Sequence, residues 1–467
     1  MKIYNKTFHR LFSQNFYKNL KLPLGQMTFT KDFINDSRGD PYPVLQKTDD
    51  CRETVENNRY AVHGGRVSRV LGQFFPYATY EVGFETLEGS VGFLFRIASR
   101  EAMLLYNGKQ LIFSSGEVFR PEELLDTLIV SCRPGAFDVY TRTNGAARFL
   151  HTFRCGSFAN AHLQKEFSAG IAALSVTGTA RIREASFYID CGISQADIRP
   201  IRYEDGCVML ENGKIYLTVS IRMQAETFQG VFSWVPGTAQ FALTGALFYD
   251  CGDGKWCGDV AASVLYHREK RKWLLWVCAF SHGHILAHAA FDGDPRFGVN
   301  VIDVELMPKP LKKAGITEFC AIERDEDPDF FYDKSSDRWL MAICRMDPAV
   351  NGYRYVFFES EDPFEGYRYL GGGLDGAETG GSFVNLQGET VFACGNDFHK
   401  VSDYRIYTRR GMHRGKFDFP DGGFRGWGTL IPVSQGSRTR YYWLTFDRHN
   451  GSDYNWSYGN LYCFEAM

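Results

Sequence analysis

The chain has 467 residues and a formal net charge of −3, and aromatic residues make up 15% of it. This charge gives no basic excess that would favour nucleic acid as a partner. The longest apolar runs have the length of strands and are too short to cross a membrane. We therefore expect no nucleic-acid partner and no membrane association, and the aromatic content favours a folded, strand-rich protein.

The twelve cysteines and the first residues of the chain indicate the cellular compartment of the protein. The cysteines do not cluster in CxxC pairs, so they give no zinc or redox motif. Several, including Cys278 and Cys344, lie in apolar runs where a free thiol packs as a small hydrophobic group. The opening MKIYNKTFHRLF lacks the apolar core of a signal peptide. We expect reduced cysteines, a cytoplasmic location, and neither a cofactor nor a metal.

Residues 1–195 show short alternating strands separated by turns. Asn107-Gly108 predicts a two-residue hairpin turn, because both residues tolerate the positive φ that such turns need. The regular spacing predicts a β-sandwich over this region, and the strand pattern resembles concanavalin-like (laminin-G-like) jelly rolls. The expected strands cover residues 77–85, 91–97, 103–106, 110–113, 127–132, 137–142, 169–176 and 180–189.

Residues 196–467 differ in composition and contain a repeat. All eight tryptophans of the chain lie in this part, after residue 230. Five units, each with an acidic or polar start, a strand, a turn and an aromatic strand, begin near 205, 259, 327, 378 and 429. Their spacing of about fifty residues fits a four-stranded propeller blade. A chance repeat of hairpins is the alternative, but it does not explain acids at the same position. We predict an all-β chain with a β-sandwich followed by a five-bladed β-propeller.

Acidic residues open four of these units. They are Asp205, Asp259, Asp327 and Glu378. The first strand of each blade lines the central channel, so side chains at the same position in successive blades converge on one pocket. Carboxylates that converge repel each other, which raises the pKa of at least one and places an acid beside a base. Cleavage of a glycosidic bond uses such a pair.

The acidic positions resemble those of five-bladed propeller glycosidases, the arabinanase and xylosidase family (family 43) and the invertase and levanase family (family 32). The resemblance implies that Asp205 is the base or nucleophile. It implies that Asp327, within Glu326-Asp327-Pro328, stabilises the transition state and adjusts pKa values, and that Glu378 is the general acid. Two departures are that glycine follows Asp205 where these families have proline, and that Glu326 stands where an arginine is usual.

Other polar and aromatic residues are candidates to bind substrate. The HxH spacing around His282 is loose for a metal and favours pocket lining. An indole can stack on a sugar or pack two blades together, and an arginine can pair with the acids or bind a substrate carboxylate. The sequence leaves these alternatives open. The candidates are Asp259, Trp256, His282, Arg324, Arg345, Trp427 and His449.

The function expected from these features is a glycoside hydrolase that releases terminal sugars, furanosides among them, from oligosaccharides by a paired-carboxylate mechanism. An oligosaccharide is therefore the expected partner. Two alternatives stay open. A glycoside phosphorylase would use phosphate in place of water, and a non-catalytic protein would bind carbohydrate through the same architecture.

Overall fold

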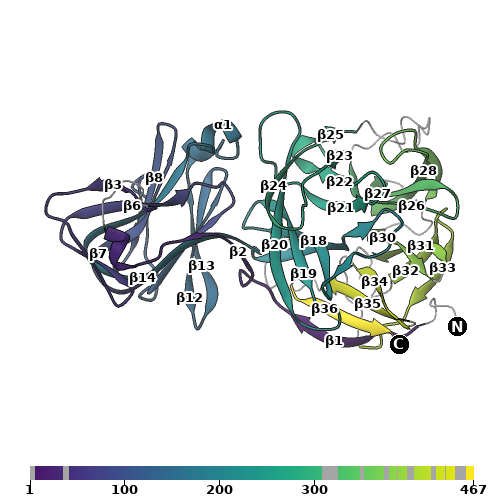
Figure 1. The fold of residues 1–467 in the computed structure, drawn as a ribbon, viewed down its shortest axis with the longest axis horizontal. Helices are drawn as coiled ribbons and strands as arrows, with labels where there is room; N and C mark the ends of the chain where they lie inside the picture. The colour runs from purple at the N-terminus through teal and green to yellow at the C-terminus, as the bar shows by residue number, and fades with distance from the viewer. Residues whose placement is uncertain are drawn as a thin grey trace. The chain divides into compact units, whose positions relative to one another are not determined.

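The chain is almost entirely β-strand in the computed structural model, which describes residues 6–34, 41–307, 324–347, 352–372, 378–386, 388–396, 404–421, 428–436, 438–446 and 459–466. Its contacts divide it into two compact units (Figure 1). The N-terminal unit comprises Lys21–Asp190 and Gly254–Trp256, and the propeller unit comprises Met1–Leu20, Cys191–Asp253 and Cys257–Met467. No helix within the described ranges has the length and apolarity needed to span a membrane.

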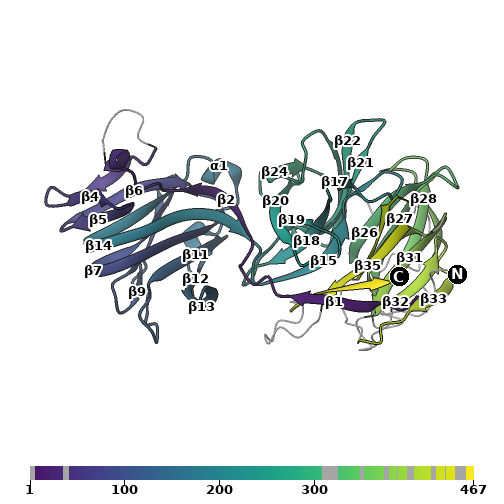
Figure 2. The same cartoon turned by 60° about the horizontal axis from the view of Figure 1, so that its bottom comes forward.

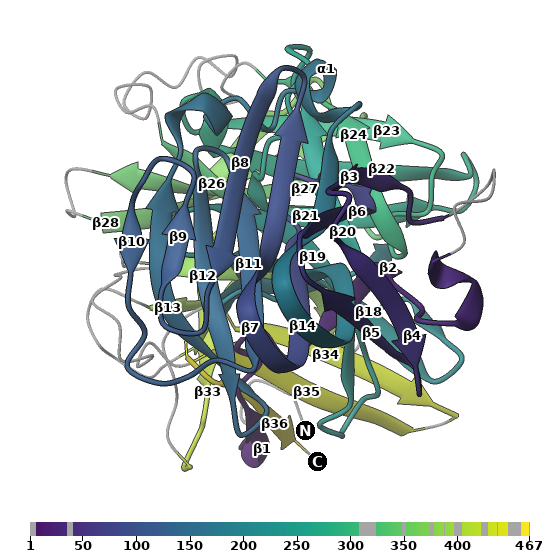
Figure 3. The same ribbon diagram turned by 90° about the vertical axis from the view of Figure 1, so that its left-hand side faces the viewer.

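The N-terminal unit is built on two long strands, β7 (Thr79–Ile97) and β14 (Ile171–Asp190), which pair along most of their lengths (Figure 3). Gly89 of β7 lies within this pairing and has a φ of +151°. A Cβ at this position would lie 2.0 Å from the carbonyl oxygen of Thr177 in β14, so only glycine fits. The sequence predicts a β-sandwich in this region. That sandwich stays a prediction, and the strand pairing runs through one 13-stranded sheet in which β7 and β14 join the strands on either side of them.

The remaining elements of this unit are short. Its strands are β2 (Lys21–Gln26), β3 (Val44–Lys47), β4 (Arg52–Glu56), β5 (Arg59–His63), β6 (Arg66–Gln73), β8 (Arg100–Tyr106), β9 (Leu111–Phe113), β10 (Val118–Phe119), β11 (Thr127–Arg133), β12 (Ala136–Thr143) and β13 (Ala146–Arg154). Its helices are η2 (Lys31–Ile34), η3 (Gly156–Phe158) and α1 (Gln164–Phe167).

Over the described residues the propeller unit forms five sheets, which confirms the predicted blade number (Figure 2). Their main strands pair antiparallel, and the marginal strands β24 and β16 pair parallel to β20 and β21. Blade 1 contains β15 (Ser194–Pro200), β18 (Lys214–Arg222), β19 (Thr227–Trp234) and β20 (Phe241–Asp250), with β17 (Leu210–Glu211) and β24 (Gly298–Asp303) at its margins. Blade 2 contains β21 (Val260–His267), β22 (Lys272–Ala279) and β23 (Ile285–Phe291), flanked by β16 (Arg202–Tyr203) and β25 (Glu305–Leu306). The helix η4 (Phe280–His282) joins β22 to β23.

The other three blades have four strands each. Blade 3 contains β26 (Asp325–Asp333), β27 (Arg338–Asp347), β28 (Gly352–Ser360) and β29 (Arg368–Gly372). Blade 4 contains β30 (Glu378–Leu386), β31 (Glu389–Asn396), β32 (Tyr404–Thr408) and β33 (His413–Phe417). Blade 5 contains β34 (Thr429–Gln435), β35 (Arg438–Phe446), β36 (Leu461–Ala466) and β1 (His9–Gln14).

The first strands of the five blades form a ring. β15, β21, β26, β30 and β34 lie side by side in this order, and β34 lies beside β15 again, so the ring is closed. The outermost strand of blade 5 is β1, which pairs with β36 and so joins the two ends of the chain. The first twenty residues therefore belong to the propeller unit, whereas the sequence analysis places them in a first domain of residues 1–195.

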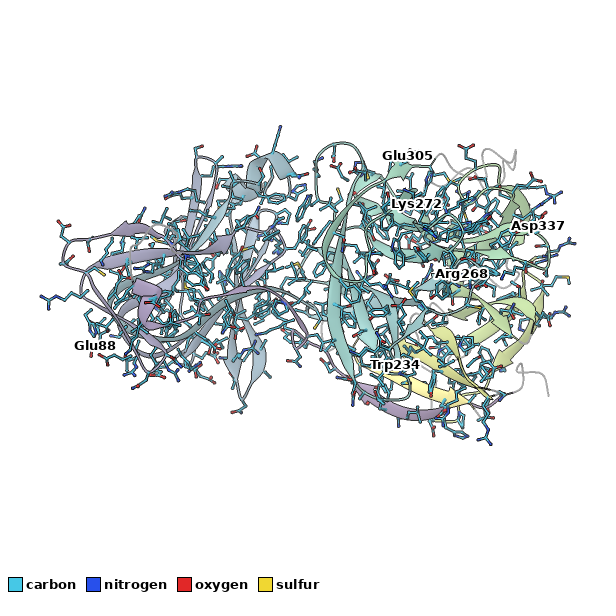
Figure 4. The ribbon with its side chains drawn as sticks, in the orientation of Figure 1. Glu88, Trp234, Arg268, Lys272, Glu305 and Asp337 are labelled. Carbon is cyan, nitrogen blue, oxygen red and sulfur yellow. The ribbon has the colours of Figure 1, made fainter. Side chains whose placement is uncertain are left out.

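Aromatic side chains fill the spaces between blades, as stacking of sheets around an axis requires. Trp234 of blade 1 (Figure 4) stacks on Phe241 at a centroid distance of 5.8 Å and meets Tyr442 of blade 5 edge-on at 5.5 Å. Trp276 and Trp443 are fully buried as well. These three buried indoles help to pack the blades of the propeller.

Candidate active site

The first strands of blades 1 to 4 share an irregularity near their N-terminal ends. In each strand the pairing register shifts by a bulge, and a residue next to the shift has a positive φ between 53° and 62°. Such a backbone is uncommon for residues other than glycine, and bulges are frequent beside active sites, where they redirect a side chain. The four left-handed residues are Asp197, Ala261, Asp327 and Gly380. Two of these equivalent positions therefore carry a carboxyl group.

Asp197 and Asp327 are both buried, at 5% and 4% exposure, and the charge of Asp197 acts on Asp327. Burial is the largest cause that raises the pKa of Asp327 well above its usual range, and the charges of Glu326 and Asp197 add to it. Burial also raises the pKa of Asp197, but Arg222, Ser220 and Arg199 oppose that rise. The two carboxyls thus have unequal affinities for a proton.

Glu326 lies beside this pair on the solvent side. Its side chain is 15% exposed, and its Oε1 atom accepts a hydrogen bond of 2.6 Å from the Tyr353 hydroxyl. His284 places its Nε2 atom 3.2 Å from the same oxygen. Because Glu326 acts on both Asp197 and Asp327, it is the third carboxylate of the cluster.

Arg199 forms the buried floor of the cluster. It lies two residues after Asp197 and is 2% exposed. Its Nη2 atom donates to the carbonyl oxygens of Asp327 at 3.0 Å and Gly381 at 3.1 Å, and Nη1 donates to that of Pro328. One guanidinium therefore ties the bulges of blades 3 and 4 to blade 1, and it places a positive charge below the two carboxyls.

A second layer of polar side chains lies deeper in the channel, and Asp329 is at its centre. This carboxylate is fully buried and pairs with Arg202 through Oδ1. Ser263 donates to Oδ1 at 2.8 Å, and the backbone N–H of Phe383 donates to Oδ2 at 2.6 Å. With its oxygens occupied by these partners, Asp329 connects blades 2, 3 and 4 and is a structural carboxylate.

Asp205 lies at the opposite end of the channel from Asp327. It is in a turn after β16, where Lys334 donates to Oδ2 at 2.9 Å and Arg268 (Figure 4) donates to it at 2.5 Å. Asp327 is near the start of β26, and Lys334 directly follows its end. Seven residues of strand span about 20 Å, which separates Asp327 from Lys334 and its partner Asp205. Burial would raise the pKa of Asp205, but the hydrogen bonds from Lys334 and Arg268 outweigh it and lower the pKa.

Glu378 occupies the start of β30, yet its carboxylate is enclosed between blades 3 and 4. It is fully buried, Oε2 accepts a hydrogen bond of 3.2 Å from the backbone N–H of Tyr355, and Oε1 accepts one from the Tyr407 hydroxyl. The neighbouring Thr379 makes the side-chain hydrogen bond to Asp327. Of the three acids expected to be catalytic, the structure therefore places Asp327 alone in the cluster.

The residues expected to bind substrate are dispersed. Arg345 forms a buried two-pronged ion pair with Asp325, with both N···O distances at 2.6 Å, so this arginine pairs with an acid of its own blade. Arg324 is exposed. Asp259 and His282 lie close together in blade 2 with Cys251.

Trp256 belongs to the N-terminal unit, where its ring lies 4.6 Å from that of Phe167 and 6.0 Å from that of Phe75. Trp427 and His449 lie outside the described residues.

Asp197 is not among the site residues predicted from the sequence, because the repeat pattern predicts the start of the first blade at the Asp205-Gly206 turn. The run Asp197-Ile198-Arg199 precedes that turn and contains a usable signal. It places an acid two residues before a second charged residue, as Asp327-Pro328-Asp329 does in blade 3. His284 stood in the motif around His282, and its contact with Glu326 depends on the fold.

Comparison with known proteins gives likenesses at low identity. No protein-family model matches the sequence, and no curated protein matches it. A thermostable family-43 glycoside hydrolase is 14% identical with a TM-score of 0.38, over 59% of this chain and 90% of that one. An α-L-arabinofuranosidase from Podospora anserina in complex with cellotriose is 13% identical with a TM-score of 0.34, over 59% and 91%. A B. megaterium levansucrase variant is 11% identical with a TM-score of 0.40, over 59% and 84%. The five-bladed propeller itself rests on the strand pairing described above.

Proposed function

We propose that the propeller cleaves glycosidic bonds, with Asp327 as proton donor and Asp197 as base or nucleophile. The observation that carries this proposal is the pair of buried carboxyls at equivalent left-handed bulge positions of blades 1 and 3. The charge of Asp197 raises the pKa of Asp327, and that of Glu326 raises the pKa of both, so one carboxyl keeps a proton while the other is charged. Glycosidic cleavage uses this combination of an acid and a base.

The surroundings of the two carboxyls support this division of roles. Arg222 and Arg199 counteract the rise in the pKa of Asp197, which favours its charged form. Glu326 and Asp197 both raise the pKa of Asp327, which favours its protonated form. Under this assignment Glu326 keeps the donor protonated, and Glu378 fastens blades 3 and 4 and takes no part in proton transfer. The substrate proposed is the terminal sugar of an oligosaccharide.

The first test is a survey of aryl-glycosides, furanosides and pyranosides, with the parent chain and the Asp197→Asn/Asp327→Asn double variant. Release of the aryl group by the parent, lost in the double variant, supports the proposal. A rate that requires inorganic phosphate indicates a phosphorylase. Oligosaccharide binding by calorimetry without turnover of any substrate in the survey indicates a binding protein and contradicts the proposal.

The pH profile provides a second prediction. On the acidic side kcat/KM falls when the base becomes protonated, and on the basic side it falls when the donor loses its proton. Glu326 raises the pKa of Asp327, so Glu326→Gln lowers that pKa and moves the basic limb to lower pH. Because the two carboxyls are coupled, the pKa values read from the two limbs belong to the pair and not to either residue alone.

The control for this experiment is Glu305→Gln, because Glu305 is an exposed carboxylate on β25 (Figure 4). We expect it to leave both limbs in place. A basic limb that stays at the parent position in Glu326→Gln, or that moves to higher pH, contradicts the role given to Glu326.

A further inference from the structure

Three side chains, one after the last main strand of blade 1 and two from blade 2, bring sulfur, oxygen and nitrogen donors together. Cys251 directly follows β20, Asp259 directly precedes β21, and His282 ends the helix η4. One donor atom from each, the thiol sulfur, a carboxylate oxygen and a ring nitrogen, lies within 4.8 Å of the other two. Donor atoms around a tetrahedral zinc ion are about 3.5 Å apart, so small side-chain rotations suffice to bring these three to one ion.

Ser281 fixes two of the three donor groups. Its backbone N–H donates to Oδ1 of Asp259 at 2.9 Å, and its hydroxyl donates to Oδ2 at 2.7 Å. The same hydroxyl oxygen lies 2.8 Å from Nδ1 of His282. Because the hydroxyl proton points to Asp259, the oxygen accepts from Nδ1–H, and the lone pair of the imidazole is then on Nε2. An outer residue that orients a carboxylate and sets a histidine tautomer is characteristic of metal centres.

A buried hydroxyl group provides an independent indication of a ligand. Tyr249 is fully buried, and its hydroxyl has no hydrogen-bond partner among the described residues. Tyr249 lies two residues before Cys251, and Asp259 is near enough to its hydroxyl to act on it electrostatically. Water on a bound metal ion would give this hydroxyl a partner.

The charges around the thiol of Cys251 favour a cation. The carboxylates of Asp259, Asp253 and Asp250 are near enough to act electrostatically on this thiol. A divalent ion compensates the acids and binds the sulfur as thiolate.

We propose that Cys251, Asp259 and His282 bind one transition-metal ion of the zinc class, with Nε2 of the histidine as its nitrogen ligand. The mixed sulfur, nitrogen and oxygen set suits Zn²⁺, whereas Ca²⁺ and Mg²⁺ take oxygen ligands. Three protein ligands leave a fourth position for water. This site is independent of the proposed glycosidase activity, since none of its ligands belongs to the Asp197, Glu326 and Asp327 cluster.

Metal binding is tested with the full chain after treatment with a chelator. Zn²⁺ is titrated against a chromophoric competitor, and Co²⁺ is added separately as a spectroscopic probe. We expect one equivalent of Zn²⁺ with a Kd in or below the micromolar range, unaffected by excess Ca²⁺. The Co²⁺ protein should show a thiolate charge-transfer band in the near ultraviolet. Cys251→Ser should abolish that band. Cys251→Ser and His282→Gln should each abolish tight binding of the one equivalent of Zn²⁺.

Two further variants make the test specific. Ser281→Ala keeps every ligand but removes the hydroxyl, and we expect it to weaken Zn²⁺ binding by about 10- to 100-fold. Cys207→Ser is the matched control, because Cys207 is an exposed cysteine of the same unit. Circular dichroism checks that each variant is folded. Absence of a tight equivalent in the parent, or a charge-transfer band that persists in Cys251→Ser, overturns the proposal.

Discussion

Replacing Asp197 by asparagine should lower kcat on the best aryl-glycoside by about 10²- to 10⁴-fold, the usual contribution of a general acid or base. Asparagine has nearly the same shape and can keep the left-handed backbone that Asp197 adopts at a φ of 53°. The fold and substrate binding should therefore be retained, and KM should change little. The measurement is steady-state kinetics at the pH optimum of the parent, with thermal unfolding to show that the variant is folded.

Asp205→Asn is the matched control for this experiment. It makes the same chemical change at the far end of the channel, where Arg268 and Lys334 hold the carboxylate. We expect its kcat to stay near that of the parent. Loss of activity in Asp205→Asn with retention in Asp197→Asn would restore the assignment that the sequence resemblance implies and refute the one proposed here.

The repeat was readable in the sequence because each blade must bury apolar faces against two neighbours. This requirement forces a strand–turn–aromatic strand pattern with a period of about fifty residues. The position within the pattern of the acids that we propose to be catalytic was harder to predict. It depends on which residue of a bulge adopts the left-handed backbone conformation. A sequence indicates that residue only where glycine is required. Asp197 and Asp327 adopt the same backbone with different neighbours, Ile198-Arg199 and Pro328-Asp329.

Glu378 illustrates a second limit of sequence reasoning. Its position at the start of the fourth blade is as predicted, but the direction of its side chain depends on partners distant in sequence. Tyr355 and Tyr407 come from two different blades and enclose the carboxylate. Cys251 was missed for a similar reason, since it meets Asp259 and His282 only through the return of the chain between β20 and η4.

Removal of the Asp329 carboxylate should cause the largest loss of stability among single substitutions in the channel. In Asp329→Ala the buried Arg202 guanidinium loses its carboxylate partner, and Ser263 and the Phe383 N–H lose an acceptor. Breaking a buried ion pair from one side costs about 3–5 kcal/mol, because the remaining charge stays buried without compensation. Urea unfolding followed by tryptophan fluorescence measures this loss, since the described Trp276 and Trp443 are buried between blades.

A surface ion pair provides the comparison. Lys272 (Figure 4) pairs with Asp292 at 2.7 Å, and both side chains are exposed. We expect Asp292→Ala to change the free energy of unfolding by no more than about 1 kcal/mol. Adding Arg202→Met to Asp329→Ala removes the uncompensated charge, so this double variant should regain part of the loss. If Asp329→Ala is no less stable than Asp292→Ala, the carboxylate does not hold the blades together. Its burial at the centre of the channel would then suggest a role in the reaction beside Asp327.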